Sequence, residues 1–160
     1  MDIRLWHGRT IGGDHLSAPQ KAVLDAWLAA RGAAAFPARP GIDLRAIKAA
    51  LGAIAILDVL READGRARGF ATRLWGTRLV EWTGAEITGR IIDRASGPRG
   101  VLQRLSRVVE TAEPLLAPRV LVPWSPYEYK RFSVLALPLG VRPPVVDQVL
   151  CVFEPVDASA

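Results

Sequence analysis

The first strongly periodic segment of the chain predicts an amphipathic helix over residues 17–31. Ser17, with Gln20 three positions later, has the pattern of a capping box, and Gly32 supplies a C-terminal stop. The apolar side chains recur at helical spacing and share one face: Val23, Leu24, Trp27 and Leu28. This face must be covered, either by the sheet of the same chain or by a second subunit.

The next segments change period from helix to strand. Asp43 is expected to cap a short helix that ends at Gly52, with a shared apolar face made by Leu44, Ile47 and Leu51. Residues 53–60 then form a short apolar run rich in Ile, Leu and Val, which is typical of a strand. An Asp-Gly turn at residues 64–65 predicts that this strand pairs with residues 66–75 as an antiparallel hairpin.

The remaining pattern predicts a helical block followed by three strands. Thr77 and Gly84 bound a short helix, residues 85–96 are expected to be irregular, and Pro98 begins a longer amphipathic helix that ends before Pro114. Three strands are expected at 115–124, 127–139 and 145–153. Strands separated by a helical block favour an α+β fold, with one antiparallel sheet and helices packed on it.

The amino-acid composition indicates the class of protein and the cellular compartment. The chain has 160 residues, 50% hydrophobic and 23% charged, as in one globular domain. A single cysteine, Cys151, allows no intramolecular disulfide and favours a reducing compartment. No apolar stretch is long enough to span a bilayer, and no secretory signal is visible. We expect a cytoplasmic protein with no membrane contact.

The charge permits a nucleic-acid partner without favouring it. The net charge is +5 and the sequence pI is about 10.1, which would attract polyanions. The arginines, however, are interleaved with acidic residues and form no basic arm. A basic, nucleic-acid-associated regulatory protein is therefore the alternative interpretation, and it requires contiguous arginines on one face.

An enzyme is the least favoured interpretation. Residues 8–13 are glycine-rich but lack the Gly-Lys-Ser/Thr of a phosphate-binding loop. No nucleophile elbow, Cys-x-x-Cys pair or His-Glu-x-x-His motif is present. Glu110 and Glu113 lie near a helix end, where a solvated pair is the simpler explanation. We therefore expect no enzymatic activity.

Several short sequence motifs, together with the predicted order of helices and strands, resemble the PAS domain. They are WGTRLVEWTG at residues 75–84 and ITGR at 87–90. Further motifs are similar to those of a PAS subfamily that is common in alphaproteobacteria and often found as a stand-alone domain: FPAR at 36–39, Ile42-Asp43, ILDV at 56–59 and LALPL at 135–139. The resemblance covers about residues 22–156.

The resemblance implies a PAS-like five-stranded antiparallel sheet with helices on one face, plus the N-terminal amphipathic helix. We divide the chain into a flexible N-terminus at 1–16, N-terminal helices at 17–52, the PAS-like domain at 53–156 and a tail at 157–160. The family also implies a cavity between sheet and helices, and self-association or partner binding. In the family, association commonly uses the sheet and an N-terminal helix. The apolar stripe of the first helix suits that role, so we predict a dimer interface at Val23, Leu24, Trp27 and Leu28.

The residues that bind cofactors in known PAS proteins are not matched in this sequence, so it identifies no cofactor. A flavin-adduct domain needs a cysteine in the helical block, whereas Cys151 is on the last strand and is interpreted as a core residue. His7 and His15 precede the domain, so neither suits a haem axial position. Gln148 stands where flavin-binding relatives place a glutamine, but one polar residue makes no site. We find no haem, flavin-adduct or metal signature.

The candidate pocket is predicted on one face of the sheet, although strand alternation alone does not choose which. The favoured set is Phe70, Thr72, Leu74, Trp82, Tyr129, Arg131 and Gln148. If Arg131 faced inward, it would need a carboxylate partner or an anionic ligand. The sequence thus predicts a non-enzymatic sensory module that acts in trans, as a homodimer, on an unidentified signalling protein, with a small apolar or anionic ligand.

Overall fold

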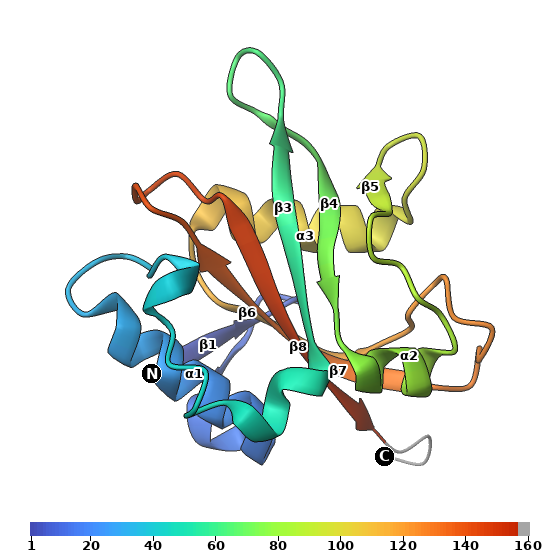
Figure 1. The fold of residues 1–160 in the computed structure, drawn as a ribbon, viewed down its shortest axis with the longest axis horizontal. Coiled ribbons are helices and arrows are strands. Elements are labelled where there is room, and N and C mark those ends of the chain that lie inside the picture. Colours follow the sequence, from blue (N-terminus) through green and yellow to red (C-terminus); the bar gives the residue numbers. More distant parts are fainter. Residues whose placement is uncertain (157–160) are drawn as a thin grey trace.

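The computed structural model describes residues 1–156, and its centre is one mixed sheet of eight strands (Figure 1). The strand order is β2-β1-β6-β7-β8-β3-β4-β5. The strands are β1 (Asp2–Leu5), β2 (Thr10–Gly12), β3 (Ile54–Arg61), β4 (Ala67–Trp75), β5 (Ile91–Asp93), β6 (Leu115–Val120), β7 (Arg131–Leu139) and β8 (Gln148–Val156). Strand β1 pairs in parallel with β6, and every other strand pair within residues 1–156 is antiparallel.

The five predicted strands form the middle of this sheet, in the order β4-β3-β8-β7-β6. The predicted count of five is too low, because β5 extends one edge and the β1–β2 hairpin extends the other. The prediction of a flexible N-terminus is also wrong at residues 2–12. Ile3 and Leu5 alternate with exposed Asp2 and Arg4, so this short strand buries one face against the core. The predicted tail at 157–160 lies outside the described residues.

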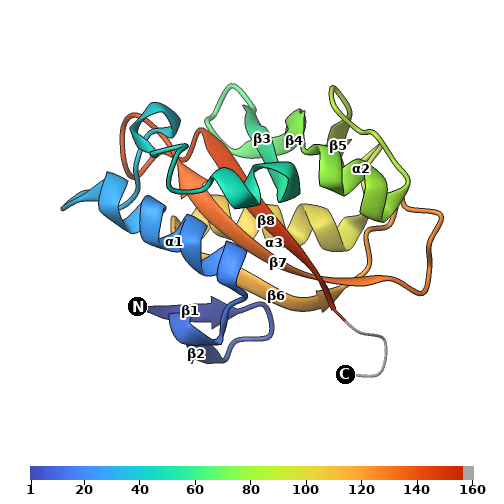
Figure 2. The same ribbon diagram turned by 60° about the horizontal axis from the view of Figure 1, so that its bottom comes forward.

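Two helices cover opposite faces of the sheet: α1 (Ala18–Arg31) and α3 (Arg99–Thr111). On β7, the side chain of Ser133 accepts a hydrogen bond from Gln20 of α1, whereas its neighbour Val134 faces a cavity under α3. Consecutive strand residues point to opposite faces, which separates the two helices. Figure 1 shows α3 behind the strands, and Figure 2 shows α1 on the nearer side. A third helix, α2 (Thr77–Thr83), follows β4.

The apolar stripe of α1 is covered by the sheet of its own chain. Val23, Leu24 and Trp27 are buried, and Leu28 is half-buried. The Trp27 Nε1–H donates to the carbonyl oxygen of Pro138 at 2.9 Å. The sequence predicts that either the sheet or a second subunit covers this stripe, and the structure shows that the sheet does. The three buried side chains are not available to a second subunit, so a homodimer would have to use another surface.

The segment between α1 and β3 differs from the predicted helix. It contains two short 3-10 helices, Arg39–Gly41 and Lys48–Ala53. The Asp43 carboxylate accepts from the backbone N–H of Arg45 at 2.9 Å, which stabilises a turn in place of a helix cap. As a result Leu44 is 61% exposed and Leu51 39% exposed, while Ile47 is buried. The three side chains do not share a buried face.

No helix within residues 1–156 has the length and apolar character needed to cross a bilayer.

Candidate functional site

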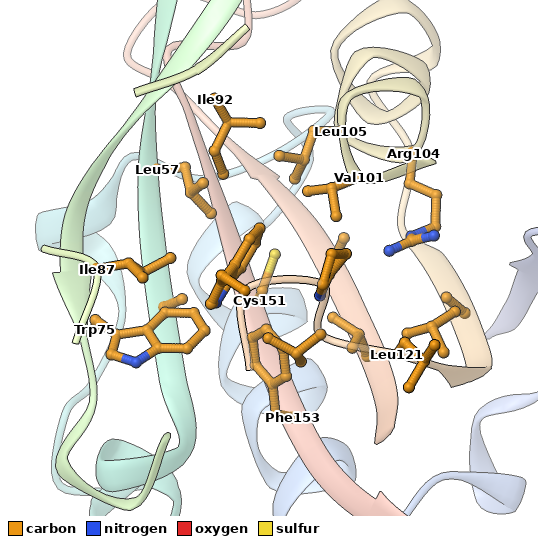
Figure 3. A pocket seen from close by; sticks show the side chains of 18 of the residues that line it. Leu57, Trp75, Ile87, Ile92, Val101, Arg104, Leu105, Leu121, Cys151 and Phe153 are labelled. Atoms are coloured by element: carbon orange, nitrogen blue, oxygen red, sulfur yellow. The ribbon is translucent and has the colours of Figure 1, made fainter. Parts of the chain in front are cut away.

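An apolar cavity of about 60 Å³ lies between the sheet and α3 (Figure 3). Three parts of the chain line it: alternate residues of the central strands, the buried side of α3, and the segment at residues 120–124, which includes the end of β6. The lining includes Ala55, Leu57, Trp75, Val101, Arg104, Leu105, Val120, Leu121, Val122, Pro123, Trp124, Val134, Ala136, Cys151 and Phe153. One water needs at least about 10–15 Å³. The cavity therefore has room for a few waters or for part of a small organic molecule.

A β-bulge decides which residues of β4 face this cavity. In the β3–β4 pairing, Ile56 is opposite Leu74 and the next residue, Leu57, is opposite Thr72, so Arg73 has no partner of its own. A bulge reverses the alternation beyond it. Thr72 therefore shares the cavity side with Leu57, whereas Leu74 turns to the other side and is 41% exposed. Trp75 returns to the cavity side, opposite Ala55.

Three aromatic rings form one end of the cavity. The ring of Trp75 lies edge-on to Trp124, with centroids 6.0 Å apart, and edge-on to Phe153 at 5.5 Å. The Trp75 Nε1–H donates to the carbonyl oxygen of Ala85 at 2.9 Å. The Trp124 Nε1–H is buried and has no hydrogen-bond partner within the described chain. A buried donor without a partner costs about 1–3 kcal/mol, so an acceptor atom of a ligand that reached this N–H would be bound favourably.

Arg104 is the charged residue of the cavity wall. It extends from α3 with its guanidinium group directed toward the cavity (Figure 3). The side chain is half-buried, and no hydrogen bond or ion pair to it is found among residues 1–156. Burial lowers the pKa of Arg104 below its ordinary value. The group nevertheless stays cationic at neutral pH, as arginine does in proteins.

Cys151 contributes a buried thiol to the same cavity from β8. Burial raises the pKa of this thiol to about 12, and the positive charge of Arg104 only partly opposes that shift. The thiolate is the reactive form of cysteine. Cys151 is therefore an inert, protonated wall residue near neutral pH.

We expect Cys151 to react with a disulfide reagent at pH 8 at least about tenfold more slowly in the folded protein than in urea, because burial raises the pKa of the thiol and so lowers the thiolate fraction. Stopped-flow labelling with and without urea measures this. The folded state should also lose stability as pH rises above 9 toward 12, since the unfolded thiol ionises first. Cys151→Ala is the control, and should lack this pH dependence. Rapid labelling of the folded protein would show that the thiol is open to solvent.

The seven residues predicted for the pocket do not line this cavity. Phe70 and Thr72 are buried, and the hydroxyl of Thr72 has no hydrogen-bond partner in the described chain. Trp82 packs against Phe132, with ring centroids 6.3 Å apart. Tyr129 is 69% exposed in the loop before β7.

The two remaining polar candidates have protein partners away from the cavity. Arg131 donates through Nη1 to the carbonyl oxygen of Glu128, so it holds no inward charge for a ligand. Gln148 donates through Nε2 to the carboxylate of Asp58 at 2.7 Å. Its neighbour Val149 pairs with the cavity residue Leu57, so alternation turns Gln148 to the opposite face.

The sequence analysis missed Arg104 and Trp124. Arg104 lies three residues after Val101 and immediately before Leu105, and both apolar residues line the cavity. A cation inside a helix's apolar stripe is a signal that could have identified Arg104. Trp124 has no such signal, because it follows β6 in an irregular segment. No group of three or more His, Cys, Asp or Glu within residues 1–156 is placed to hold a metal ion.

Comparisons with known proteins fit this architecture. A family model described as PAS domain matches residues 15–144. A solved structure of a fungal LOV domain photoreceptor is similar to the chain at 14% identity with a TM-score of 0.42; the match covers 74% of this chain and 94% of that one. No curated protein matches the chain. The resemblance to one bacterial subfamily stays a prediction. Since the family model spans most of the sequence, the chain belongs to the PAS domain family.

Proposed function

We propose that this PAS domain is a non-enzymatic sensory or regulatory module that binds a small ligand in the cavity beneath α3. The observation that carries the proposal is the buried indole N–H of Trp124, a residue of the apolar cavity wall, which has no hydrogen-bond partner within residues 1–156. Apolar pockets with a few convergent polar groups are the usual form of small-molecule sites. The ligand would supply the acceptor that the described residues do not.

The ionisable groups of the cavity favour binding over catalysis. Arg104 and Cys151 are the titratable side chains in its lining. Arg104 keeps its proton, and burial keeps Cys151 protonated because its pKa is raised to about 12. General acid–base catalysis needs a group whose pKa lies near the working pH. Neither residue meets that requirement, which supports a sensory role.

The segment at residues 120–124 connects the cavity to the protein surface, so a ligand in the cavity can change what the surface presents. It lines the cavity through Val122 and Trp124, while its Leu121 is partly exposed. Just beyond it, the Ser125 hydroxyl donates to the carbonyl oxygen of Thr83 at the end of α2, at 2.6 Å. A ligand that prefers one position of this segment shifts its population. We propose that a partner protein, or a second copy of the chain, responds to that shift in trans.

Native mass spectrometry of the purified protein, beside its denatured mass and its visible absorption spectrum, tests this function first. A non-covalent mass excess, or a coloured band, is expected if a ligand is retained during purification. A ligand lost during purification is tested by titrating benzyl alcohol into the ¹⁵N-labelled protein. The chain has five tryptophans, and Trp124→Phe identifies which indole N–H signal belongs to that residue.

A saturable shift of the Trp124 signal is the expected result of that titration. The cavity-filling variant Ala136→Leu is the control, because Ala136 lines the cavity, and it should abolish the shift. A wild-type protein that shows neither a mass excess nor a shift would contradict ligand binding, and would favour an interaction module with a closed core.

A further inference from the structure

Among the described residues, the two unpartnered polar side chains of the cavity lining share one chemical property: both are hydrogen-bond donors. The guanidinium of Arg104 and the indole N–H of Trp124 are donor groups with no acceptor capacity. The sulfur of Cys151, which also lines the cavity, is only a weak acceptor. A ligand that complements the site must therefore bring acceptor atoms, and the positive charge of Arg104 favours acceptors that are anionic.

Arg104 differs from its neighbour Arg107, one turn along the same helix. The Arg107 guanidinium lies 4.5 Å from the ring centroid of Trp6 and donates to the Trp6 carbonyl oxygen at 3.3 Å, so the protein itself satisfies it. The ion pairs found in the described chain include neither arginine. Arg104 thus combines partial burial, an apolar setting and no partner among residues 1–156, which is a costly arrangement for a charge unless an anion completes it.

We propose that the cavity takes a small organic carboxylate with an apolar body, whose carboxylate pairs with Arg104 and whose body lies among the aromatic and aliphatic side chains. This inference rests on the proposed function, because it names the ligand class of the same cavity. A guanidinium suits a carboxylate because its fork of N–H groups matches the two oxygens. The 60 Å³ volume limits the body to a few carbon atoms or one ring that widens the site.

Matched pairs of probes separate charge from apolar fit. Benzoate is compared with benzyl alcohol, and hexanoate with hexanol, by titration of the Trp124 indole signal and by calorimetry. The wild-type protein is expected to bind each acid at least tenfold more tightly than the alcohol of the same size, since hydrogen bonds to charged groups are the stronger ones. The preference for the acid should weaken as salt is added.

Three variants assign the preference to one side chain. Arg104→Gln is expected to abolish the acid preference, so that each acid and its matched alcohol bind with similar affinity, and Arg104→Lys is expected to keep part of the preference. Arg107→Gln, which removes a charge of the same sign from the same helix, should keep the full preference. Thermal melts of each variant establish that it is folded before its affinities are compared.

The failures of the two proposals are distinguishable. Equal affinity for acid and alcohol, or an acid preference that survives Arg104→Gln, would overturn the carboxylate assignment and leave the cavity as a binding site. Binding of neither probe class, together with no retained mass, would overturn the carboxylate assignment along with the proposed function. A preference that Arg107→Gln removes as fully as Arg104→Gln would also overturn it, because it would reflect the general surface charge.

Discussion

Replacing Trp27 by alanine is expected to destabilise the protein by about 3–5 kcal/mol, as large-to-small core substitutions of aromatic residues do. Trp27 has no exposed surface, and it joins α1 to the sheet through packing and through its hydrogen bond to Pro138. The substitution would leave both a cavity and a carbonyl without its donor. Since small domains are stable by about 5–15 kcal/mol, this is a large part of the total. Urea denaturation followed by circular dichroism measures it.

Two further variants separate the contributions at this site. Trp27→Phe keeps an aromatic ring and removes the donor, so we expect a smaller loss of about 1–3 kcal/mol. Lys21→Ala breaks an exposed ion pair with Asp25 on the same helix, and should cost less than about 1 kcal/mol. A Trp27→Ala protein as stable as Lys21→Ala would show that α1 does not pack on this sheet as described.

The substitution Gly76→Ala is expected to cost about 2–3 kcal/mol or more, because a Cβ atom at this position would collide with backbone. It would contact the carbonyl oxygen of Gly52 and lie 2.6 Å from the Gly52 carbonyl carbon. The φ of Gly76 is −61°, so the cost arises from crowding and not from backbone strain. The Gly76 N–H also donates to the carbonyl oxygen of Ile54 at 2.9 Å, which holds the start of α2 against β3.

Gly100→Ala is the matched control for this prediction. Gly100 lies in α3, and its added Cβ would meet only the Nη1 of Arg104, at 3.5 Å, an ordinary contact. Alanine is favoured over glycine in a helix, so we expect this variant to gain about 0.5–1 kcal/mol. Thermal and urea unfolding of both variants make the comparison. Gly76→Ala with wild-type stability would mean that α2 can move away from Gly52 without loss.

The sequence predicted well those elements whose signals are local. The capping box is observed: the Ser17 hydroxyl accepts from the Gln20 N–H at 3.3 Å, and the Gln20 side chain accepts from the Ser17 N–H at 3.4 Å. The Asp-Gly turn connects β3 to β4 as expected, and α3 begins after Pro98. Each of these features depends on residues within one turn of helix or one hairpin, so neighbouring letters suffice to identify it.

The site was harder to predict because it depends on pairing between distant strands. Strict alternation placed Leu74 with Thr72, and only the register of β3 against β4 reveals the bulge that separates them. The orientation of Gln148 likewise follows from the pairing of β8 with β3, which places it on the face opposite the cavity. The short strand at Asp2–Leu5 has a partner, β6, that lies far along the chain. No local pattern encodes that contact.

The placement of α1 has a consequence for how the protein is made. Gln20 donates to the carbonyl oxygen of Val152, so a helix near the start of the chain packs against its last described strand. During synthesis the apolar stripe of α1 emerges from the ribosome long before β8 exists to cover it. Contacts that are distant in sequence form late and slow folding. Until β7 and β8 have been synthesised, Trp27 lacks the strands that bury it, and transiently exposed apolar surface of this kind is what makes folding chains prone to aggregate.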